Sequence, residues 1–224
     1  MNKIPVITID GPSGSGKGTV AALTAKDLGF RLLDSGALYR SLAVSAIKRK
    51  VNLEDHRQLA DLAGCLNIEF GLFGSGSVSL DGEDVSLEIR TDIVSKAASL
   101  LGTIPAVRTA LHDQQLAFRK EPGLVADGRD MGTVVFPDAL VKIYLTARVE
   151  ERVQRRYKQL IDKGIDATLP HLLRDLKERD AKDSERPISP LKPAKDAVVL
   201  DTTDLQVEHV VRQVMSIVRD RLAS

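Results

Sequence analysis

The chain has 224 residues, enough to bury a substantial core, and its 32 basic and 31 acidic residues leave a formal net charge of +1. This balance gives no reason to expect nucleic acid or an anionic membrane as a partner. No apolar stretch approaches the ~18 residues of a membrane-spanning helix, and the apolar run before Asp10 is too short for a signal peptide, so we expect a cytoplasmic protein. The lone cysteine, Cys65, cannot form an internal disulfide, and its apolar helical surroundings predict a small buried side chain.

The first predicted element is a buried strand over Pro5 to Ile9, and a glycine-rich segment, Gly11 to Thr19, follows it directly. Such a loop points backbone N–H groups at a polyphosphate, while Lys17 adds a positive charge near the β and γ phosphates and Thr19 is placed to hold magnesium. The segment departs from the G-x-x-x-x-G-K-[ST] pattern because Gly18 follows the lysine. A turn that only joins a strand to a helix is the alternative, but the helical pattern after it favours a nucleoside triphosphate site. The predicted phosphate-binding residues are Gly11, Pro12, Ser13, Gly14, Ser15, Gly16, Lys17, Gly18 and Thr19.

A second strand is predicted over Phe30 to Leu33, followed by a helix that Asp34 or Ser35 can cap, with Arg40 one turn later. Capping alone explains the first two residues. The segment nevertheless lies at the carboxyl end of a strand, where ligands of open α/β sheets bind, so a role in binding remains equally open.

Between Ile68 and Val85 the pattern changes to short alternating stretches around a glycine- and serine-rich segment, Gly71 to Ser77. The Asp81-Gly82 pair between alternating residues is a hairpin signal. We expect a small antiparallel sheet inserted beside the main one.

The third predicted core strand, Leu124 to Ala126, leads into a loop with two acids, one arginine and two glycines, Asp127 to Thr133. A guanidinium can bind phosphate in a bidentate manner and a carboxylate can accept from an exocyclic amine, so Arg129 and Asp130 suit the two ends of a nucleotide. A turn held by a surface ion pair is the alternative. A fourth strand is expected over Val141 to Leu145.

Arginines then recur at a spacing of four, which places Arg148, Arg152 and Arg156 on one helix face. On the sequence alone a solvated row is favoured, since Glu150 and Glu151 neutralise it. A phosphoryl-transfer enzyme would instead need such arginines near the transferring group, because charge stabilisation supplies most of the catalysis.

A highly charged segment, Lys177 to Arg186, carries Arg179 and Asp183 on one face. It is either a helix end or, beside a nucleotide, a source of phosphate and ribose ligands. Proline at every third position predicts a stiff, extended connector over Arg186 to Lys195. A last strand over Ala197 to Leu200 and an amphipathic helix over Val207 to Leu222 complete a predicted five-stranded parallel sheet flanked by helices.

Five motifs occur together in this order: Asp10-Gly-Pro-Ser-Gly-Ser-Gly-Lys-Gly-Thr19, Leu33-Asp-Ser-Gly-Ala-Leu-Tyr-Arg40, Ile89-Arg-Thr91, Ala126-Asp-Gly-Arg-Asp-Met-Gly-Thr133 and Lys177-Glu-Arg-Asp180. With them the chain resembles the bacterial cytidylate kinases, a family of nucleoside monophosphate kinases, over essentially its whole length. The resemblance implies a P-loop NTPase fold with an acceptor-binding insertion and a short lid. It also implies transfer of the γ-phosphoryl group of ATP, with Mg2+, to CMP or dCMP.

The family's functional residues map onto this sequence one by one. The resemblance implies that Lys17 bridges the donor phosphates, that Arg40 and Arg129 hold the acceptor phosphate with Ser35 beside it, and that Arg152 and Arg156 fall in the lid. The cytosine is expected to meet Ser99, Arg108 and Asp130, and Asp183, Arg179 and Arg186 are expected near the ribose and phosphate. The implied catalytic residues are Lys17, Arg129, Arg179, Arg152 and Arg156.

The expected organisation is a core of residues 1–34, 104–147 and 169–224, a monophosphate-binding subdomain at 35–103 and a lid at 148–168. The resemblance implies a monomer that binds small nucleotides and neither nucleic acid nor membrane. A kinase of the same fold for UMP or AMP is the nearest alternative. A nucleotide-binding switch module is the other, although the chain lacks an Asn-Lys-x-Asp signature and carries acceptor-side arginines that a switch does not need.

Overall fold

A computed structural model describes residues 3–73, 76–162, 164 and 166–223 of the chain. Gly74 and Ser75 of the predicted small-sheet segment lie outside the described residues, as do positions 163 and 165 of the predicted lid and the terminal positions 1–2 and 224. None of the helices in the described ranges is both long and apolar enough to cross a membrane.

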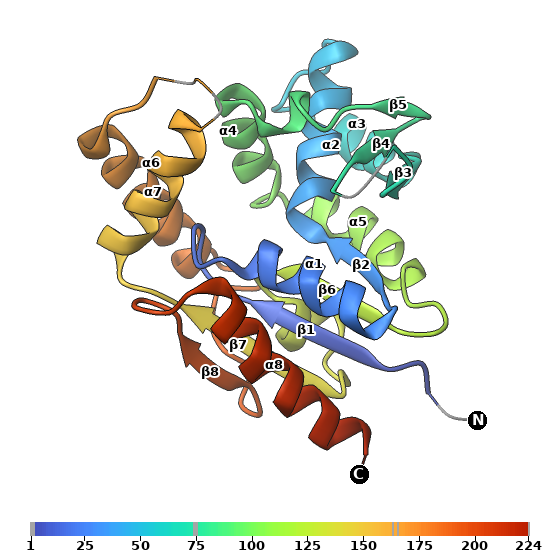
Figure 1. The fold of residues 1–224 in the computed structure, drawn as a ribbon. Helices are drawn as coiled ribbons and strands as arrows, with labels where there is room; N and C mark the ends of the chain where they lie inside the picture. The colour runs from blue at the N-terminus through green and yellow to red at the C-terminus, as the bar shows by residue number, and fades with distance from the viewer. Residues whose placement is uncertain (1–2, 74–75, 163, 165, 224) are drawn as a thin grey trace.

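The centre of the molecule is a five-stranded sheet in which neighbouring strands pair in parallel (Figure 1). Its strand order is β2-β6-β1-β7-β8. The strands are β1 (Val6–Asp10), β2 (Arg31–Asp34), β6 (Leu124–Gly128), β7 (Val141–Thr146) and β8 (Val198–Asp201). All five predicted strands are therefore confirmed, each within two residues at either end. The observed strands extend slightly further at their carboxyl ends.

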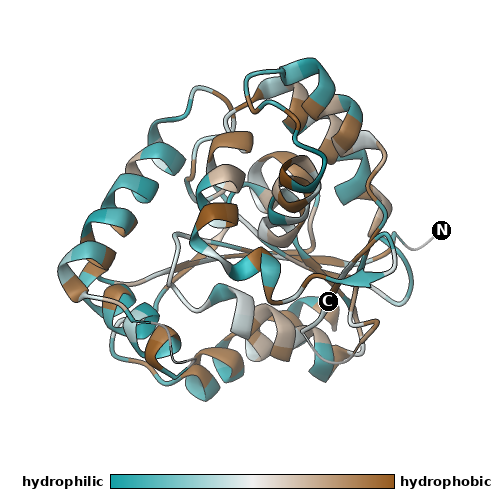
Figure 2. Ribbon diagram, turned by 90° about the horizontal axis from the view of Figure 1, so that it is seen from above, coloured by the Kyte–Doolittle hydropathy of each residue, from teal (hydrophilic) through white to brown (hydrophobic). Residues whose placement is uncertain are grey.

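Helices cover both faces of this sheet, as its apolar strands require. On one face, α1 (Lys17–Leu28) and α8 (Val207–Leu222) pack against Ile7, Ile9 and Ile143. The opposite face is covered mainly by α2 (Ser35–Lys48) and α5 (Pro105–Ala117), together with α3 (His56–Gly64) and α4 (Asp92–Leu101). Figure 2 shows the resulting pattern, with mostly hydrophobic strands in the centre and helices that carry both hydrophilic and hydrophobic residues.

The predicted small antiparallel sheet is present, with strands β3 (Ile68–Phe70), β4 (Val78–Leu80) and β5 (Glu83–Asp84). Asp81 and Gly82 form the two-residue turn between β4 and β5, and both have positive φ, 52° and 86°. Two positive φ values are typical of a type I′ hairpin, for which Asp-Gly is a favoured sequence. A short helical turn, η1 (Glu88–Arg90), then leads into α4.

Two helices, α6 (Val149–Ile161) and α7 (Leu169–Glu185), form a separate layer beside the carboxyl ends of the strands (Figure 1). They pack on each other through Val153, Leu160 and Leu172. The predicted lid segment, 148–168, thus consists largely of α6. Its division from the core remains a prediction.

Two expectations from the sequence are wrong. Cys65 is exposed, because α3 ends at Gly64 and the helical spacing that predicted burial no longer applies one residue later. The connector over Arg186 to Lys195 is not uniformly extended, because Ser189 has a φ of 52° and the chain bends there.

Candidate active site

The phosphate-binding loop leads directly into α1 at Lys17. Gly14 and Gly16 have φ values of 79° and 88°, in the left-handed region that favours glycine. Gly16 is the residue that precedes the helix, and no side chain caps it. A helix N-terminus preceded by such a loop is suited to bind an anion, because its first N–H groups have no acceptor within the helix.

Lys17 lies between this loop and the end of β6. Its Nζ donates to the Pro12 carbonyl oxygen at 3.3 Å and lies 4.0 Å from Oδ1 of Asp127. Burial, and then the positive charge of Arg129, lower the pKa of Lys17, while the nearby Asp127 opposes the shift. Burial likewise raises the pKa of Asp127, and Lys17 opposes it. A polyanion would therefore find a lysine whose charge is incompletely compensated.

Gly18, the residue that breaks the usual loop pattern, lies against the same carboxylate. A Cβ at this position would lie 3.1 Å from Oδ2 of Asp127, closer than side chains normally pack. Because Asp127 is itself buried, it has little room to move. The extra glycine therefore lets β6 and α1 approach closely.

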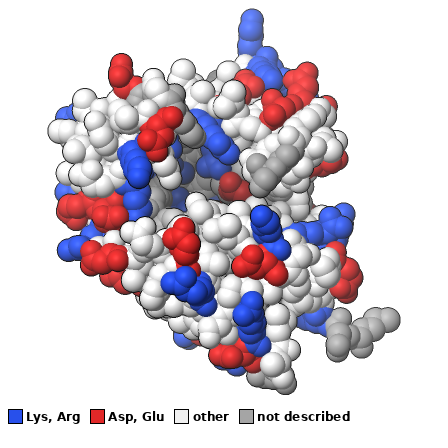
Figure 3. Space-filling view, viewed as in Figure 1, with Lys and Arg blue, Asp and Glu red and all other residues white. Residues whose placement is uncertain are grey.

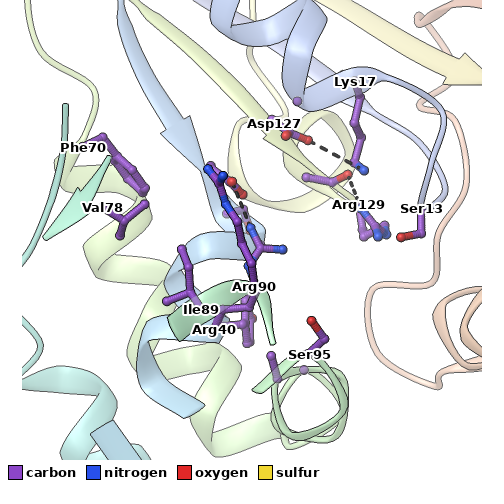
Figure 4. A pocket seen from close by; sticks show the side chains of 18 of the residues that line it. Ser13, Lys17, Arg40, Phe70, Val78, Ile89, Arg90, Ser95, Asp127 and Arg129 are labelled. Carbon is purple, nitrogen blue, oxygen red and sulfur yellow. Dashed lines mark hydrogen bonds and ion pairs between the residues drawn. The ribbon is translucent and has the colours of Figure 1, made fainter. Parts of the chain in front are cut away.

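A cavity of about 1880 Å³ opens between the phosphate-binding loop, α2, α4, the end of β6 and α7. Figure 3 shows the hollow on the face seen in Figure 1, with blue basic side chains on its wall. Figure 4 shows Lys17 reaching toward Asp127 with Arg129 close by, while Arg40 comes from α2 and Arg90 from η1. The cavity thus joins the phosphate-binding loop to a second set of basic residues.

One part of this second set belongs to the start of α2. Asp34 caps the helix, since its Oδ1 accepts from the Ala37 N–H at 2.8 Å, which confirms the predicted capping. Its other oxygen, Oδ2, accepts from Arg40 at 3.0 Å. The cap therefore also holds a guanidinium that lines the cavity.

A second part joins the residue after β6 to α7. Nε of Arg129 donates to Asp183 Oδ2 at 2.7 Å, and both side chains are largely buried. Burial alone would raise the pKa of Asp183, but the charges of Arg129, Arg179 and Arg186 together lower it. Burial and the charge of Arg129 lower the pKa of Arg179 to about 10, and among the described residues its buried Nε has no acceptor. This cluster holds more positive charge than Asp183 can compensate.

The third part surrounds Asp130, which is 4% exposed. Its Oδ2 forms an ion pair with Arg108 of α5, and its Oδ1 lies 3.7 Å from Nη2 of Arg186. Arg108 also donates to the Tyr39 hydroxyl at 3.4 Å and to the Gly102 carbonyl at 3.3 Å. A carboxylate and a guanidinium are thus fixed side by side at the cavity wall.

Asp10 directly precedes the phosphate-binding loop and connects it to the segment that follows Asp130. Its two carboxylate oxygens accept the Met131 and Gly132 N–H groups, at 2.9 and 2.8 Å. Burial raises the pKa of Asp10 to about 7, although the two hydrogen bonds oppose the rise. Asp10 therefore fixes the π-helical turn η2 (Met131–Val135), where a loop was expected, and with it the position of the two preceding residues.

The family model described as cytidylate kinase matches residues 7–220. The chain belongs to the cytidylate kinase family. The cytidylate kinase of Stutzerimonas stutzeri (strain A1501) is 54% identical over 224 residues, which covers 99% of this chain and 98% of the relative. That of Burkholderia pseudomallei (strain K96243) is 56% identical over 216 residues, or 96% and 93% of the two chains.

Among solved structures, an uncharacterized protein from Eubacterium ventriosum ATCC 27560 is similar, with a TM-score of 0.54 and 13% identity. The match covers 97% of this chain and 99% of that chain. It shows a shared fold and no more.

Most of the residues that the cytidylate kinase resemblance singled out line the cavity. They are Ser13, Gly14, Gly16, Lys17, Gly18, Thr19, Ser35, Arg40, Ser99, Arg108, Arg129, Asp130, Arg156, Arg179, Asp183 and Arg186. Gly11, Pro12, Ser15 and Arg152 are not among the residues on its wall.

The three arginines of the predicted solvated row have three different environments. Arg148 is exposed and pairs with Asp204 at 3.1 Å. Arg152 is buried, against the solvated interpretation, because α6 packs on the phosphate-binding loop: it donates to the Ser13 carbonyl at 3.0 Å and pairs with Asp180 at 2.6 Å. Arg156 remains partly exposed at the cavity.

Two further residues belong to the site and were not singled out as ligands. Tyr39 lies within the motif Leu33 to Arg40, but only the structure shows its contact with Arg108. Gln115 is buried on α5 and donates to Ser35. A signal for Gln115 exists in the sequence: it follows the core positions Val107 and Leu111 at a spacing of four, where an apolar residue would be expected.

Within the described ranges, no group of three or more His, Cys, Asp or Glu side chains is arranged to hold a metal ion.

Proposed function

We propose that this chain transfers the γ-phosphoryl group of ATP to CMP or dCMP, giving ADP and CDP or dCDP. The observation that carries the proposal is that the phosphate-binding loop and the cluster around Arg129 and Asp130 line one cavity. A donor triphosphate and an acceptor monophosphate can therefore be held in the same space, which direct transfer requires.

On the donor side, the N–H groups of the phosphate-binding loop and the start of α1 bind the triphosphate, and Lys17 contacts its β and γ phosphates. Binding replaces the weak contact of Lys17 with Asp127 by a stronger one with the phosphates, since 4.0 Å is long for an ion pair. Arg152 donates to the Ser13 carbonyl and so stabilises the loop, but it does not line the cavity.

The residues at the start of α1 fit a magnesium ion carried with ATP. Mg2+ prefers hard oxygen ligands, and P-loop enzymes supply them from a loop hydroxyl and an aspartate at the end of a neighbouring strand. Thr19 provides such a hydroxyl at the cavity. Among the described residues, the buried Oδ1 of Asp127 accepts no hydrogen bond, which leaves it available to the ion or its water. When bound there with ATP, the ion would supply positive charge that offsets the negative charge of the donor phosphates.

On the acceptor side, Arg40 and Arg129 bind the monophosphate, with Ser35 beside it. Arg179 and Arg156 lie on the same cavity and stabilise the charge on the transferring group. Asp183 holds Arg129 at 2.7 Å and also receives the ribose hydroxyls.

The Asp130 and Arg108 pair provides selectivity for cytosine. Cytosine presents an amino donor next to two acceptors, the ring nitrogen and the carbonyl oxygen, so it needs an acceptor next to a donor. Asp130 and Arg108 are fixed in that order, and Ser99 lies on the same wall. Uracil reverses the first two positions and would leave Asp130 facing a carbonyl oxygen, which is costly in a buried site.

We further propose that the segment 148–168 acts as a lid over a core of 1–34, 104–147 and 169–224, with 35–103 binding the acceptor. Closure excludes water, which would otherwise accept the phosphoryl group. The protein is expected to act as a cytoplasmic monomer without nucleic acid, in line with its nearly balanced charge and single cysteine.

A steady-state panel of CMP, dCMP, UMP and AMP with saturating ATP tests the proposal. It predicts the highest kcat/KM values for CMP or dCMP. Similar kcat/KM values for AMP and CMP, or a higher kcat/KM for UMP, would contradict the cytidylate function and indicate a related kinase. ATP hydrolysis without transfer to any acceptor would instead indicate a switch module.

A further inference from the structure

Gln115 lies behind the acceptor side of the cavity and does not form part of its wall. It is 3% exposed, two turns along α5 from Arg108, so both side chains extend from the same side of one helix. Its Nε2 donates to Oγ of Ser35 at 2.9 Å, and Ser35 is itself 5% exposed. This hydrogen bond joins two elements that are 80 positions apart in sequence.

The direction of this hydrogen bond decides what Ser35 can do. A serine hydroxyl has one proton to donate and two lone pairs that accept. Because the amide N–H of Gln115 uses a lone pair, the single proton of Ser35 is not used on Gln115. That proton is left for another acceptor, and Ser35 lines the cavity between Asp34 and the helix turn that carries Arg40.

We propose that Gln115 is a positioning residue for the acceptor: it holds the Ser35 hydroxyl so that its proton points at the phosphate of the bound nucleoside monophosphate. The inference rests on the proposed function, because it takes Ser35 to lie at the acceptor phosphate. A donor held in advance loses less entropy on binding than a freely rotating one. The helix α5 would thus serve both ends of the acceptor: Gln115 positions a donor for the phosphate, and Arg108 is itself a donor for the base.

The alternative is that Gln115 only fills space and satisfies a buried polar group. The variant Gln115→Glu separates the two interpretations, because it keeps the size of the side chain and reverses the hydrogen bond. A carboxylate can only accept, so it takes the proton of Ser35 and turns it away from the phosphate. We expect KM for CMP to rise at least about tenfold, the effect of one lost hydrogen bond to a charged group, with KM for ATP within about twofold.

A pH series adds a readout that a space-filling role would not give. Burial raises the pKa of an introduced glutamate, and its protonated form can again donate to Ser35. The CMP defect of Gln115→Glu relative to the unmodified protein should therefore shrink as the pH falls from 8 toward 6. Gln115→Met, which folds without a buried charge, should give a smaller, pH-independent rise in KM for CMP of about threefold.

Two comparisons complete the design. In a Ser35→Ala background, Gln115→Glu should add no further rise in KM for CMP, because the group that it redirects is gone. Asp113→Asn is the control on the same helix: the side chain of Asp113 is 91% exposed, so this change should leave KM for CMP and KM for ATP unchanged.

The outcomes separate this inference from the function on which it rests. If the unmodified protein does not phosphorylate CMP or dCMP, the proposed function fails and this role fails with it. If it does, but Gln115→Glu and Gln115→Met leave KM for CMP unchanged or raise KM for ATP equally, the function stands and the positioning role is refuted. Additive effects of Gln115→Glu and Ser35→Ala would also refute it.

Discussion

Replacing Asp130 by asparagine changes the charge of the cavity wall with almost no change in shape. The side chain of Asp130 is 6% exposed, and those of Arg108 and Arg186 beside it are 11% and 8% exposed. Asparagine keeps one acceptor oxygen and replaces the other by an N–H donor. Two buried guanidinium groups then lose their shared carboxylate, which costs up to about 3–5 kcal/mol of stability when a buried pair is broken completely. A clear fall in Tm is expected.

The effect on activity follows from the cytosine amino group. A hydrogen bond to a charged acceptor contributes about 1.5–3 kcal/mol, so kcat/KM for CMP should fall by about 10- to 150-fold. The new amide N–H can donate to the carbonyl of uracil, so kcat/KM for UMP should fall less or rise. The ratio of kcat/KM for CMP to that for UMP should therefore decrease at least about tenfold.

The assay is a coupled steady-state measurement with CMP or UMP at saturating ATP, together with KM for ATP at saturating CMP. Asp113→Asn is the matched control, since Asp113 has a side chain that is 91% exposed on α5 and should leave all values unchanged. An unchanged CMP to UMP ratio in Asp130→Asn, or a rise in KM for ATP as large as that for CMP, would refute the placement of Asp130 at the base.

Three further predictions concern the donor side. Gly18→Ala should not gain the roughly 1 kcal/mol of stability that helix propensity favours, because the new Cβ meets Asp127, and kcat/KM should fall about tenfold. A variant with a higher Tm and full activity would contradict the close packing. In the free enzyme, Lys17 is mostly charged only below its lowered pKa, so kcat/KM for ATP should fall with rising pH well below the ~10.4 of an ordinary lysine. Lys17→Arg should shift this fall to higher pH, and identical pH profiles for the two proteins would contradict the role of Lys17. Arg152→Met should lower Tm and raise KM for ATP more than KM for CMP, because Arg152 donates to the Ser13 carbonyl and pairs with Asp180. A rise in KM for CMP alone would contradict this role on the donor side.

Local patterns predicted the fold well. The strand runs and the helix over 207–222 were confirmed, because apolar period and strand length depend on neighbours along the chain. The Asp81-Gly82 hairpin was confirmed for the same reason: the two-residue turn needs positive φ at both positions. Local patterns failed where an element ended, as at Cys65, or where one residue left the expected conformation, as at Ser189.

The sequence predicted which residues line the cavity better than it predicted the contacts that they make. The motifs named many of the residues on the cavity wall, because three of the five motifs run on from β1, β2 and β6, whose carboxyl ends lie at the same edge of the parallel sheet. Arg152 shows the limit: its helix looks solvated until the structure places α6 against the phosphate-binding loop. Gln115 shows a second limit, since its partner Ser35 lies on another helix and no local pattern pairs them.

We propose that one cavity holds both nucleotides end to end. The most direct test is inhibition and calorimetric titration with an adenosine–cytidine pentaphosphate, a single molecule that carries both ends. We expect one bound molecule per chain, competition with both ATP and CMP, and tighter binding than that of the adenosine–adenosine analogue. Two molecules per chain, or competition with ATP alone, would contradict a joined donor and acceptor site.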